Sequence, residues 1–346
     1  MRNRRATLIL AILAWAFTGP GGAAHPSQAT GQPQGQRASA CDGPMAGVFS
    51  YYSFQKRLER WPEARTQLTY VDLDGPLKRH LPQLEKLVTA MRAQPGQVLQ
   101  LGIHTRRHAL GPLVRDLRNP KAPLSRALDD ILDIVDRAGF CVILRPLSEM
   151  NSGSEGSPWE LNWMKDGVMP NRPEDFIDAW RLIAHRVKSR RNPALQLMFS
   201  PLANRQQYSV QAVRQILLGI PPGQIDWFAP TIYARPGTWF GDKNRDYDSP
   251  AELVRPWVGV VRSTHHARRV RLGVAELGFS AAGDRTLQVR AWLRAARELK
   301  AAGFEYLLYF QAGNFLPGAA AREWGLPWDA SSQRRLSEGL AEFQAR

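Results

Sequence analysis

The sequence predicts an α/β protein folded as a (β/α)8 TIM barrel, and three observations predict it. Eight short apolar or β-rich segments recur along the chain, amphipathic helical stretches separate most of them, and polar side chains follow several of their ends. Strands that alternate with helices form a parallel sheet covered by those helices. Eight repeats favour the closed barrel, and an open doubly wound sheet is the alternative.

The segments expected to form the barrel strands are residues 47–52, 68–72, 98–105, 141–147, 195–200, 227–233, 271–276 and 306–310. Apolar residues recur three to four positions apart over residues 124–135, 176–187 and 287–299, which predicts helices there. Gly139 and Gly303 follow the first and third of these stretches and are expected to end the helices.

Residues 1–24 are typical of a secretory signal. Three arginines lie among the first five residues, an apolar run extends from Thr7 to Phe17, and small residues follow at 22–24. The run is shorter than the about 20 apolar residues of a spanning helix. We therefore expect a secreted or periplasmic protein with no membrane span in the mature chain; an uncleaved anchor is the alternative.

The rest of the chain divides into two parts. Residues 25–41 are rich in Gln, Gly, Pro, Ser and Ala without apolar periodicity, which indicates a flexible linker. Residues 42–346 are expected to form the barrel domain, because barrels of this class often exceed about 250 residues. We expect this domain to be a monomer.

The chain contains two cysteines, Cys41 and Cys141. Outside the cytoplasm they could form a disulfide if the N-terminal segment crosses the bottom of the barrel. Two separate buried thiols are an equal alternative.

The net charge is +15, but the arginines are scattered along the chain. A basic surface can attract anionic lipid, acidic polysaccharide or nucleic acid. No zinc-finger spacing or RNA-binding aromatic signature accompanies the charge, so we expect no nucleic-acid partner. A solubilising surface is the simplest interpretation.

Two glutamates, Glu149 and Glu276, end the fourth and seventh predicted strands. Active sites of these barrels lie at the C-terminal ends of the strands, and these two strands face each other across the mouth. Paired carboxyl groups across a cleft suit glycosidic bond cleavage, one as a protonated acid and the other ionised. Strand alternation predicts that Arg145, Leu147 and Glu149 share a face. Tyr233 is expected to donate a hydrogen bond to Glu276.

Aromatic and polar residues near the same strand ends are candidates for sugar binding. Tryptophan rings stack on the apolar faces of sugars, although we expect at least one of these rings to pack within a loop. The predicted substrate-binding residues are His104, Arg145, Asn151, Trp159, Trp163, Asn204, Tyr233, Trp239 and Gln311.

The stretch from Leu144 to Asn151 resembles the acid/base strand of glycoside hydrolase family 26, which contains β-mannanases and related endo-glucanases and xylanases. Residues 99–104, 199–204, 226–233 and 274–278 are similar to other strands of that family. The resemblance implies a retaining endo-β-glycosidase, needing no metal or cofactor, with Glu149 as acid/base and Glu276 as nucleophile. Ser148 stands where the family has histidine, and Phe310 and Gln311 replace its tryptophan after the eighth strand. These departures favour a distant member that acts on a mannan-like polysaccharide or a bacterial exopolysaccharide.

Three other functions remain open. A catalytically inactive carbohydrate-binding barrel would keep the aromatic residues and need no ionised glutamate. A metal-dependent hydrolase could use Asp72, Asp74, His104 and His108, which lack close metal-ligand spacing. The two glutamates could also serve transglycosylation.

Overall fold

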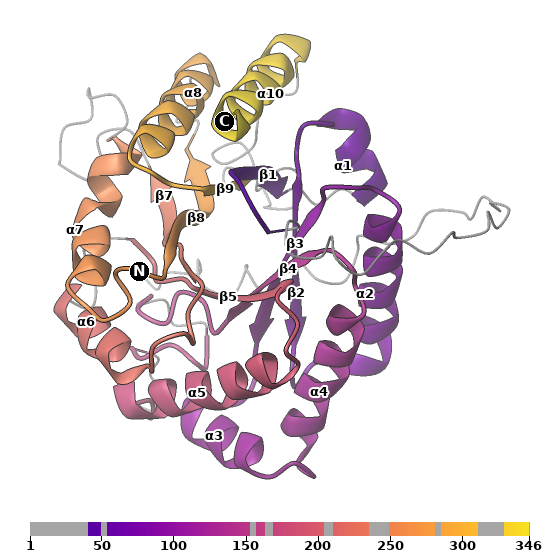
Figure 1. Cartoon of the computed structure of the whole chain (residues 1–346), viewed down its shortest axis with the longest axis vertical. Helices are drawn as coiled ribbons and strands as arrows, with labels where there is room; N and C mark the ends of the chain where they lie inside the picture. The colour runs from indigo at the N-terminus through magenta and orange to yellow at the C-terminus, as the bar shows by residue number, and fades with distance from the viewer. Residues whose placement is uncertain are drawn as a thin grey trace, which may run out of the picture.

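A computed structural model describes residues 41–49, 54–152, 157–162, 169–203, 210–234, 249–280, 285–310 and 329–345. It confirms the predicted (β/α)8 barrel, with parallel strands at the centre and helices around them (Figure 1). The predicted signal at residues 1–24 and most of the predicted linker lie outside the described residues.

The strands pair in parallel around a closed ring, because β6 pairs with both β5 and β8. The strands are β1 (Met45–Phe49), β2 (Thr66–Asp72), β3 (Val98–His104), β4 (Cys141–Pro146), β5 (Leu195–Phe199), β6 (Trp227–Phe228), β7 (Thr231–Ala234), β8 (Arg271–Phe279) and β9 (Tyr306–Phe310).

One predicted strand is divided. Residues 227–233 form β6 and β7, and the short break between them contains Pro230, which has no N–H to donate to a sheet. Both pieces pair with β8, so together they occupy one position in the barrel.

The described helices surround the barrel. They are α1 (Phe54–Arg60), α2 (Leu77–Arg92), α3 (Leu110–Arg118), α4 (Pro123–Asp136), α5 (Pro173–Ser189), α6 (Val210–Gly219), α7 (Pro250–Arg262), α8 (Arg285–Ala301) and α10 (Ala330–Gln344). The three helices predicted from periodicity correspond to α4, α5 and α8.

Local sequence explains where several of these helices begin and end. Helix α7 begins after Ser249, whose hydroxyl accepts a hydrogen bond from the N–H of Glu252, and Pro250 takes the first turn, where no N–H partner is needed. Gly139 and Gly303 follow α4 and α8 with φ of 77° and 83°. Glycine adopts this left-handed conformation without a Cβ clash, which confirms both predicted stops.

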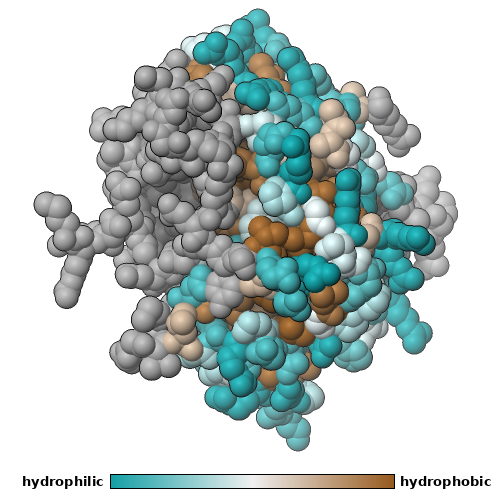
Figure 2. All heavy atoms as spheres, turned by 90° about the vertical axis from the view of Figure 1, so that its left-hand side faces the viewer, coloured by the Kyte–Doolittle hydropathy of each residue, from teal (hydrophilic) through white to brown (hydrophobic). Residues whose placement is uncertain are grey.

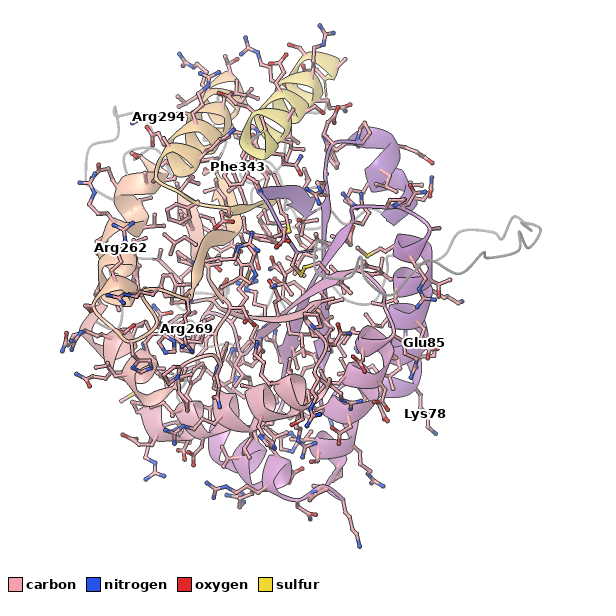
Figure 3. All side chains as sticks on the ribbon, viewed as in Figure 1. Lys78, Glu85, Arg262, Arg269, Arg294 and Phe343 are labelled. Carbon is pink, nitrogen blue, oxygen red and sulfur yellow. A yellow bond between two sulfur atoms is a disulfide. The ribbon has the colours of Figure 1, made fainter. Side chains whose placement is uncertain are left out.

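The buried apolar residues form two clusters, one inside the barrel and one between the barrel and the surrounding helices. The inner cluster contains Leu68, Ile143, Ala275 and Leu308, and the outer cluster contains the buried faces of the helices. Figure 3 shows charged side chains projecting from the outer faces of the helices, among them Lys78 and Glu85 of α2, Arg262 of α7 and Arg294 of α8, while Phe343 of α10 is buried in the outer cluster.

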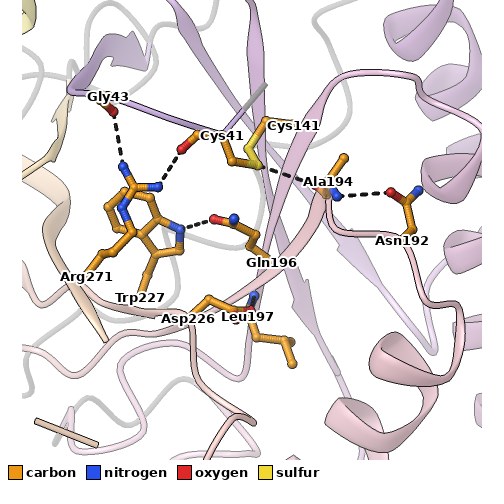
Figure 4. Close-up of a disulfide and its surroundings, with 10 residues drawn as sticks. All are labelled: Cys41, Gly43, Cys141, Asn192, Ala194, Gln196, Leu197, Asp226, Trp227 and Arg271. Carbon is orange, nitrogen blue, oxygen red and sulfur yellow. Dashed lines mark hydrogen bonds between the residues drawn. A yellow bond between two sulfur atoms is a disulfide. The ribbon is translucent and has the colours of Figure 1, made fainter. Parts of the chain in front are cut away.

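A disulfide between Cys41 and Cys141 closes the bottom of the barrel, where Cys141 begins β4 (Figure 4). The structure thus favours pairing over separate thiols. Arg271 holds the same segment, because its guanidinium donates to the carbonyls of Cys41 and Gly43. The guanidinium carbon also lies over the Trp227 ring, 4.0 Å from its centroid. Cys41, placed at the end of the predicted linker, therefore belongs to the barrel.

Among the described helices, none has the length and apolar character needed to cross a bilayer. On the side shown in Figure 2, hydrophilic residues surround a smaller area of hydrophobic ones. Of the large hydrophobic side chains that the structure describes, Met169 and Leu218 are the exposed ones.

Candidate active site

Glu149 reaches the barrel mouth through a turn rather than along a strand. Strand β4 ends at Pro146, and Leu147 and Glu149 have φ of 50° and 59°. These left-handed residues break the alternation of side chains, so Leu147 packs in the outer cluster with Leu144. The prediction that Leu147 shares a face with Arg145 and Glu149 was therefore wrong, although Glu149 does return to Arg145.

A β-bulge aims Glu276 into the barrel. Against β9, Val274 pairs with Leu307 and Leu277 pairs with Tyr309, so Ala275 and Glu276 together oppose one residue. An extra residue of this kind re-aims the side chain next to it. Ala275 belongs to the inner cluster, and Glu276 also points inward, where its side chain is 3% exposed.

Three donors hold the carboxylate of Glu276. Tyr70 and Arg145 donate to Oε1, and Tyr233 donates to Oε2 at 2.5 Å. The predicted bond from Tyr233 is therefore present. The guanidinium and the two hydroxyl donors supply the hydrogen bonds that a buried carboxylate needs.

Glu149 lies in a different environment. Its side chain is 25% exposed, and Oε1 lies 3.4 Å from Arg145 Nη2. Burial of the carboxyl and the negative charge of Glu276 raise the pKa of Glu149 to about 7, against the attraction of Arg145. This carboxyl is therefore protonated below about pH 7, where an unperturbed glutamate would already be ionised.

Arg145 joins the two carboxyl groups. It is fully buried, and besides Glu276 and Glu149 it donates to Thr231 Oγ1 at 2.6 Å and to the Tyr70 hydroxyl at 3.1 Å. One guanidinium thus links Glu149, whose pKa is raised, to Glu276, which is held by three donors, and this difference in environment suits the roles of acid and nucleophile.

His104 lies beside this group, next to the ring of Tyr70, and bonds to Ser148. Its Nε2 is 2.8 Å from Ser148 Oγ, and its ring stacks on Trp159 with centroids 4.3 Å apart. Burial, followed by the charge of Arg145, lowers the pKa of His104 to about 3. The imidazole is therefore neutral at ordinary pH, suited to hydrogen bonding.

Trp159 and Asn151 mainly support the surrounding loops. The Trp159 indole donates to the carbonyl of Ser148 at 2.9 Å, and the residue is only 4% exposed. The Asn151 amide bonds both the N–H and the carbonyl of Leu202. Their predicted contact with substrate remains a prediction, while their contacts with the loops are evident.

Four predicted substrate-binding residues lie outside the described residues: Trp163, Asn204, Trp239 and Gln311. Two residues in the cluster were missed by sequence reasoning, Tyr70 and Thr231. Tyr70 could have been found by alternation, because it lies two positions after Leu68 of the inner cluster.

Of the residues of the metal-dependent alternative, Asp72 and Asp74 contact the loop after β3, which includes His108, whereas His104 lies against Ser148 and Trp159. Asp74 accepts from the backbone N–H groups of Arg106 and Arg107 and from His108 Nδ1, at 2.6 to 2.8 Å. Asp72 pairs with Arg106. The carboxylates of Asp72 and Asp74 are thus already hydrogen-bonded to neighbouring residues of the chain.

Comparisons with known proteins find similar structures but no similar sequences. No family model and no curated protein matches the chain. Solved structures do: a family 26 β-mannanase from Bacteroides ovatus is 13% identical with a TM-score of 0.54, covering 89% of this chain and 90% of that one. An endo-1,4-β-xylanase from Penicillium canescens is 9% identical with a TM-score of 0.55, covering 88% and 96%.

A broad-specificity endoglucanase of family 5 from Clostridium cellulovorans is 11% identical with a TM-score of 0.56, covering 90% of this chain and 98% of that one. At these identities the similarity establishes the fold. The barrel that the resemblance to family 26 implies is therefore confirmed, and the family 5 endoglucanase has the same fold.

Proposed function

We propose that this chain is an exported retaining glycoside hydrolase, a distant relative of family 26, that cleaves a β-linked polysaccharide. The observation that carries the proposal is the single buried guanidinium of Arg145 between Glu276, which is held by three donors, and Glu149, whose pKa is raised to about 7. Similar barrels whose names state mannanase, xylanase and endoglucanase activity support the reaction class.

In the first step, a carboxylate oxygen of Glu276 attacks the anomeric carbon while Glu149 gives its proton to the departing sugar oxygen. The glycosidic bond breaks, and a glycosyl ester forms on Glu276. In the second step, Glu149 takes a proton from water, whose oxygen attacks the anomeric carbon and releases Glu276.

Arg145 fits both halves of this cycle. Before the first step Glu276 carries the negative charge, and after it the charge resides on Glu149. Because Arg145 contacts both carboxyl groups, its positive charge is balanced in each state without movement of either strand. A buried cation without such a partner would be strongly destabilising.

Export is supported by the signal-like residues 1–24 and by the Cys41–Cys141 disulfide, since disulfides persist in oxidising compartments. For the substrate we propose a mannan-like polysaccharide or a bacterial exopolysaccharide. The departures from family 26 at Ser148 and Phe310 support a specificity different from that of the mannanases.

The test is a screen of the purified protein on β-mannans, β-glucans, xylans and acidic exopolysaccharides. Proton NMR of the first product should show the β-anomer, the result of retention. Glu149→Ala and Glu276→Ala should lose this activity, whereas Glu85→Gln on the exposed side of α2 should keep it. Binding of an oligosaccharide without turnover would instead support the sugar-binding barrel, and loss of activity in a chelator would favour a metal-dependent enzyme.

A further inference from the structure

We propose that Tyr70 is a positioning residue that fixes the orientation of the Glu276 carboxylate for attack. This inference rests on the proposed function and adds a residue of β2 to its machinery. The hydroxyl of Tyr70 donates to Glu276 Oε1, opposite the bond that Tyr233 makes to Oε2. Each oxygen of the carboxylate therefore has its own tyrosine, from a different strand.

The need for such a residue follows from the glutamate side chain. The terminal torsion of glutamate is broad, so the plane of its carboxylate is set by hydrogen-bond partners rather than by a rotamer well. A donor at one oxygen alone would leave the carboxylate free to turn about that contact. Tyr233 at Oε2 and the pair of Tyr70 and Arg145 at Oε1 restrict this rotation. Tyr70 adds a second direction of contact to the one that Arg145 makes at Oε1, and one lone pair stays directed to the position of the anomeric carbon.

Arg145 determines which way the Tyr70 hydroxyl points. Arginine has no acceptor, so at 3.1 Å its Nη1 can only donate to the Tyr70 oxygen. The hydroxyl proton is then available for Glu276. Burial, followed by the charge of Glu276, raises the pKa of Tyr70 well above its usual value, so the hydroxyl remains a donor at all working pH values.

The sequence around Tyr70 makes room for its ring. Tyr70 pairs with Gly102 of β3, and a Cβ at Gly102 would lie 2.2 Å from Tyr70 Cδ1. Phe49 packs edge-on against the Tyr70 ring with ring centroids 6.2 Å apart, and the centroid of the His104 ring lies 5.3 Å from that of Tyr70. The absent side chain at Gly102 and these two rings fix where the Tyr70 hydroxyl lies.

The experiment compares Tyr70→Phe, Gly102→Ala and Tyr309→Phe with wild type. Tyr70→Phe removes the hydroxyl and keeps the ring, whereas Gly102→Ala keeps the hydroxyl and displaces the ring. Tyr309 belongs to the outer cluster and serves as the control. Each variant is assayed on an unactivated oligosaccharide from the screen and on the 2,4-dinitrophenyl β-glycoside of the same sugar, which needs little protonation. Product affinity and melting temperature are measured alongside.

Tyr70→Phe should lower kcat/KM about ten- to hundredfold, because a hydrogen bond to a charged group is lost. The loss should be equal on both substrates, since it concerns the nucleophile and not the proton donor. Gly102→Ala should show the same pattern, product affinity should stay unchanged, and Tyr309→Phe should keep wild-type rates.

Rates within about twofold of wild type in Tyr70→Phe, or a loss confined to one substrate, would overturn the proposal. A parallel fall in product affinity and melting temperature would reduce Tyr70 to a structural role and overturn it too. A wild type that cleaves neither substrate would overturn the proposed function itself, and with it the nucleophile that Tyr70 is proposed to position. If Tyr70→Phe does not fold, Gly102→Ala decides the question on the same criteria.

Discussion

Ala275 and Glu276 both face the interior of the barrel, although they are consecutive residues of β8. Regular alternation would place Glu276 on the face of Val274, which packs in the outer cluster. The bulge between Val274 and Leu277 reverses this and brings Glu276 to Arg145 and the two tyrosines. The candidate nucleophile is thus positioned by an irregularity of the strand.

The raised pKa of Glu149 predicts a basic limb in the pH–rate profile. The first step requires the protonated carboxyl, so kcat/KM on an unactivated oligosaccharide should fall as pH rises through about 7. His104 contributes no limb in this range, because its pKa is lowered to about 3. The measurement is kcat/KM from about pH 4 to pH 10, and a rate that remains flat to about pH 9 would contradict the assignment.

Glu149→Ala should retain cleavage of a 2,4-dinitrophenyl glycoside, because its leaving group needs little protonation. Added azide should raise the turnover of this variant and yield the β-glycosyl azide, since azide replaces water at the glycosyl ester without needing a base. Azide is expected to produce no such retained product with Glu276→Ala. Products are identified by NMR, and an α-glycosyl azide from Glu149→Ala would reverse the two roles.

Trp159→Ala should act through the loop rather than through loss of a stacking platform. Its ring is buried against His104 and bonds the Ser148 carbonyl, so truncation should destabilise the fold by roughly 3–5 kcal/mol. Trp159→Phe keeps most of the packing and should lose less. Chemical denaturation measures the effect, and unchanged stability with weaker oligosaccharide binding would favour a sugar-stacking role.

Removal of the disulfide should weaken the fold without changing the chemistry. Cys41 and Cys141 are separated by 100 positions, and a loop of that length confers roughly 4–5 kcal/mol in the chain-entropy model. The double variant Cys41→Ser with Cys141→Ser should unfold at lower denaturant concentration yet retain kcat at 25 °C, because the bond lies at the bottom of the barrel. An unchanged midpoint would contradict this.

The sequence was sufficient for the architecture because its signals are local and repeated. Apolar segments at the observed strand positions and helices ended by Gly139 and Gly303 can be read without tertiary information. The sequence also predicted that Glu149 and Glu276 lie near each other, although it placed both at strand ends, whereas Glu149 lies in a turn after β4 and Glu276 lies within β8. Their final directions could not be predicted, since the positive φ angles at Leu147 and Glu149 and the bulge at Glu276 arise where tertiary contacts override alternation.

Tertiary contacts also determine the surroundings of Thr231 and Trp159. Thr231 follows Pro230 in the predicted strand, and only the closed ring shows that it lies beside Arg145. The sequence predicts Trp159 as a sugar-binding residue because it follows Glu149, and this remains a prediction. Its burial against His104 depends on the path of the loop, which periodicity does not determine.

Covalent trapping shows whether Glu276 is the nucleophile. The wild type is incubated with a 2-deoxy-2-fluoro glycosyl fluoride of the sugar identified by the screen, digested, and mapped by mass spectrometry. Fluorine at C2 slows release of the glycosyl ester, so the nucleophile stays labelled. We expect one label, on Glu276, absent from Glu276→Ala. A label on Glu149, or hydrolysis of that sugar at wild-type rate by Glu276→Ala, would show that Glu276 is not the nucleophile.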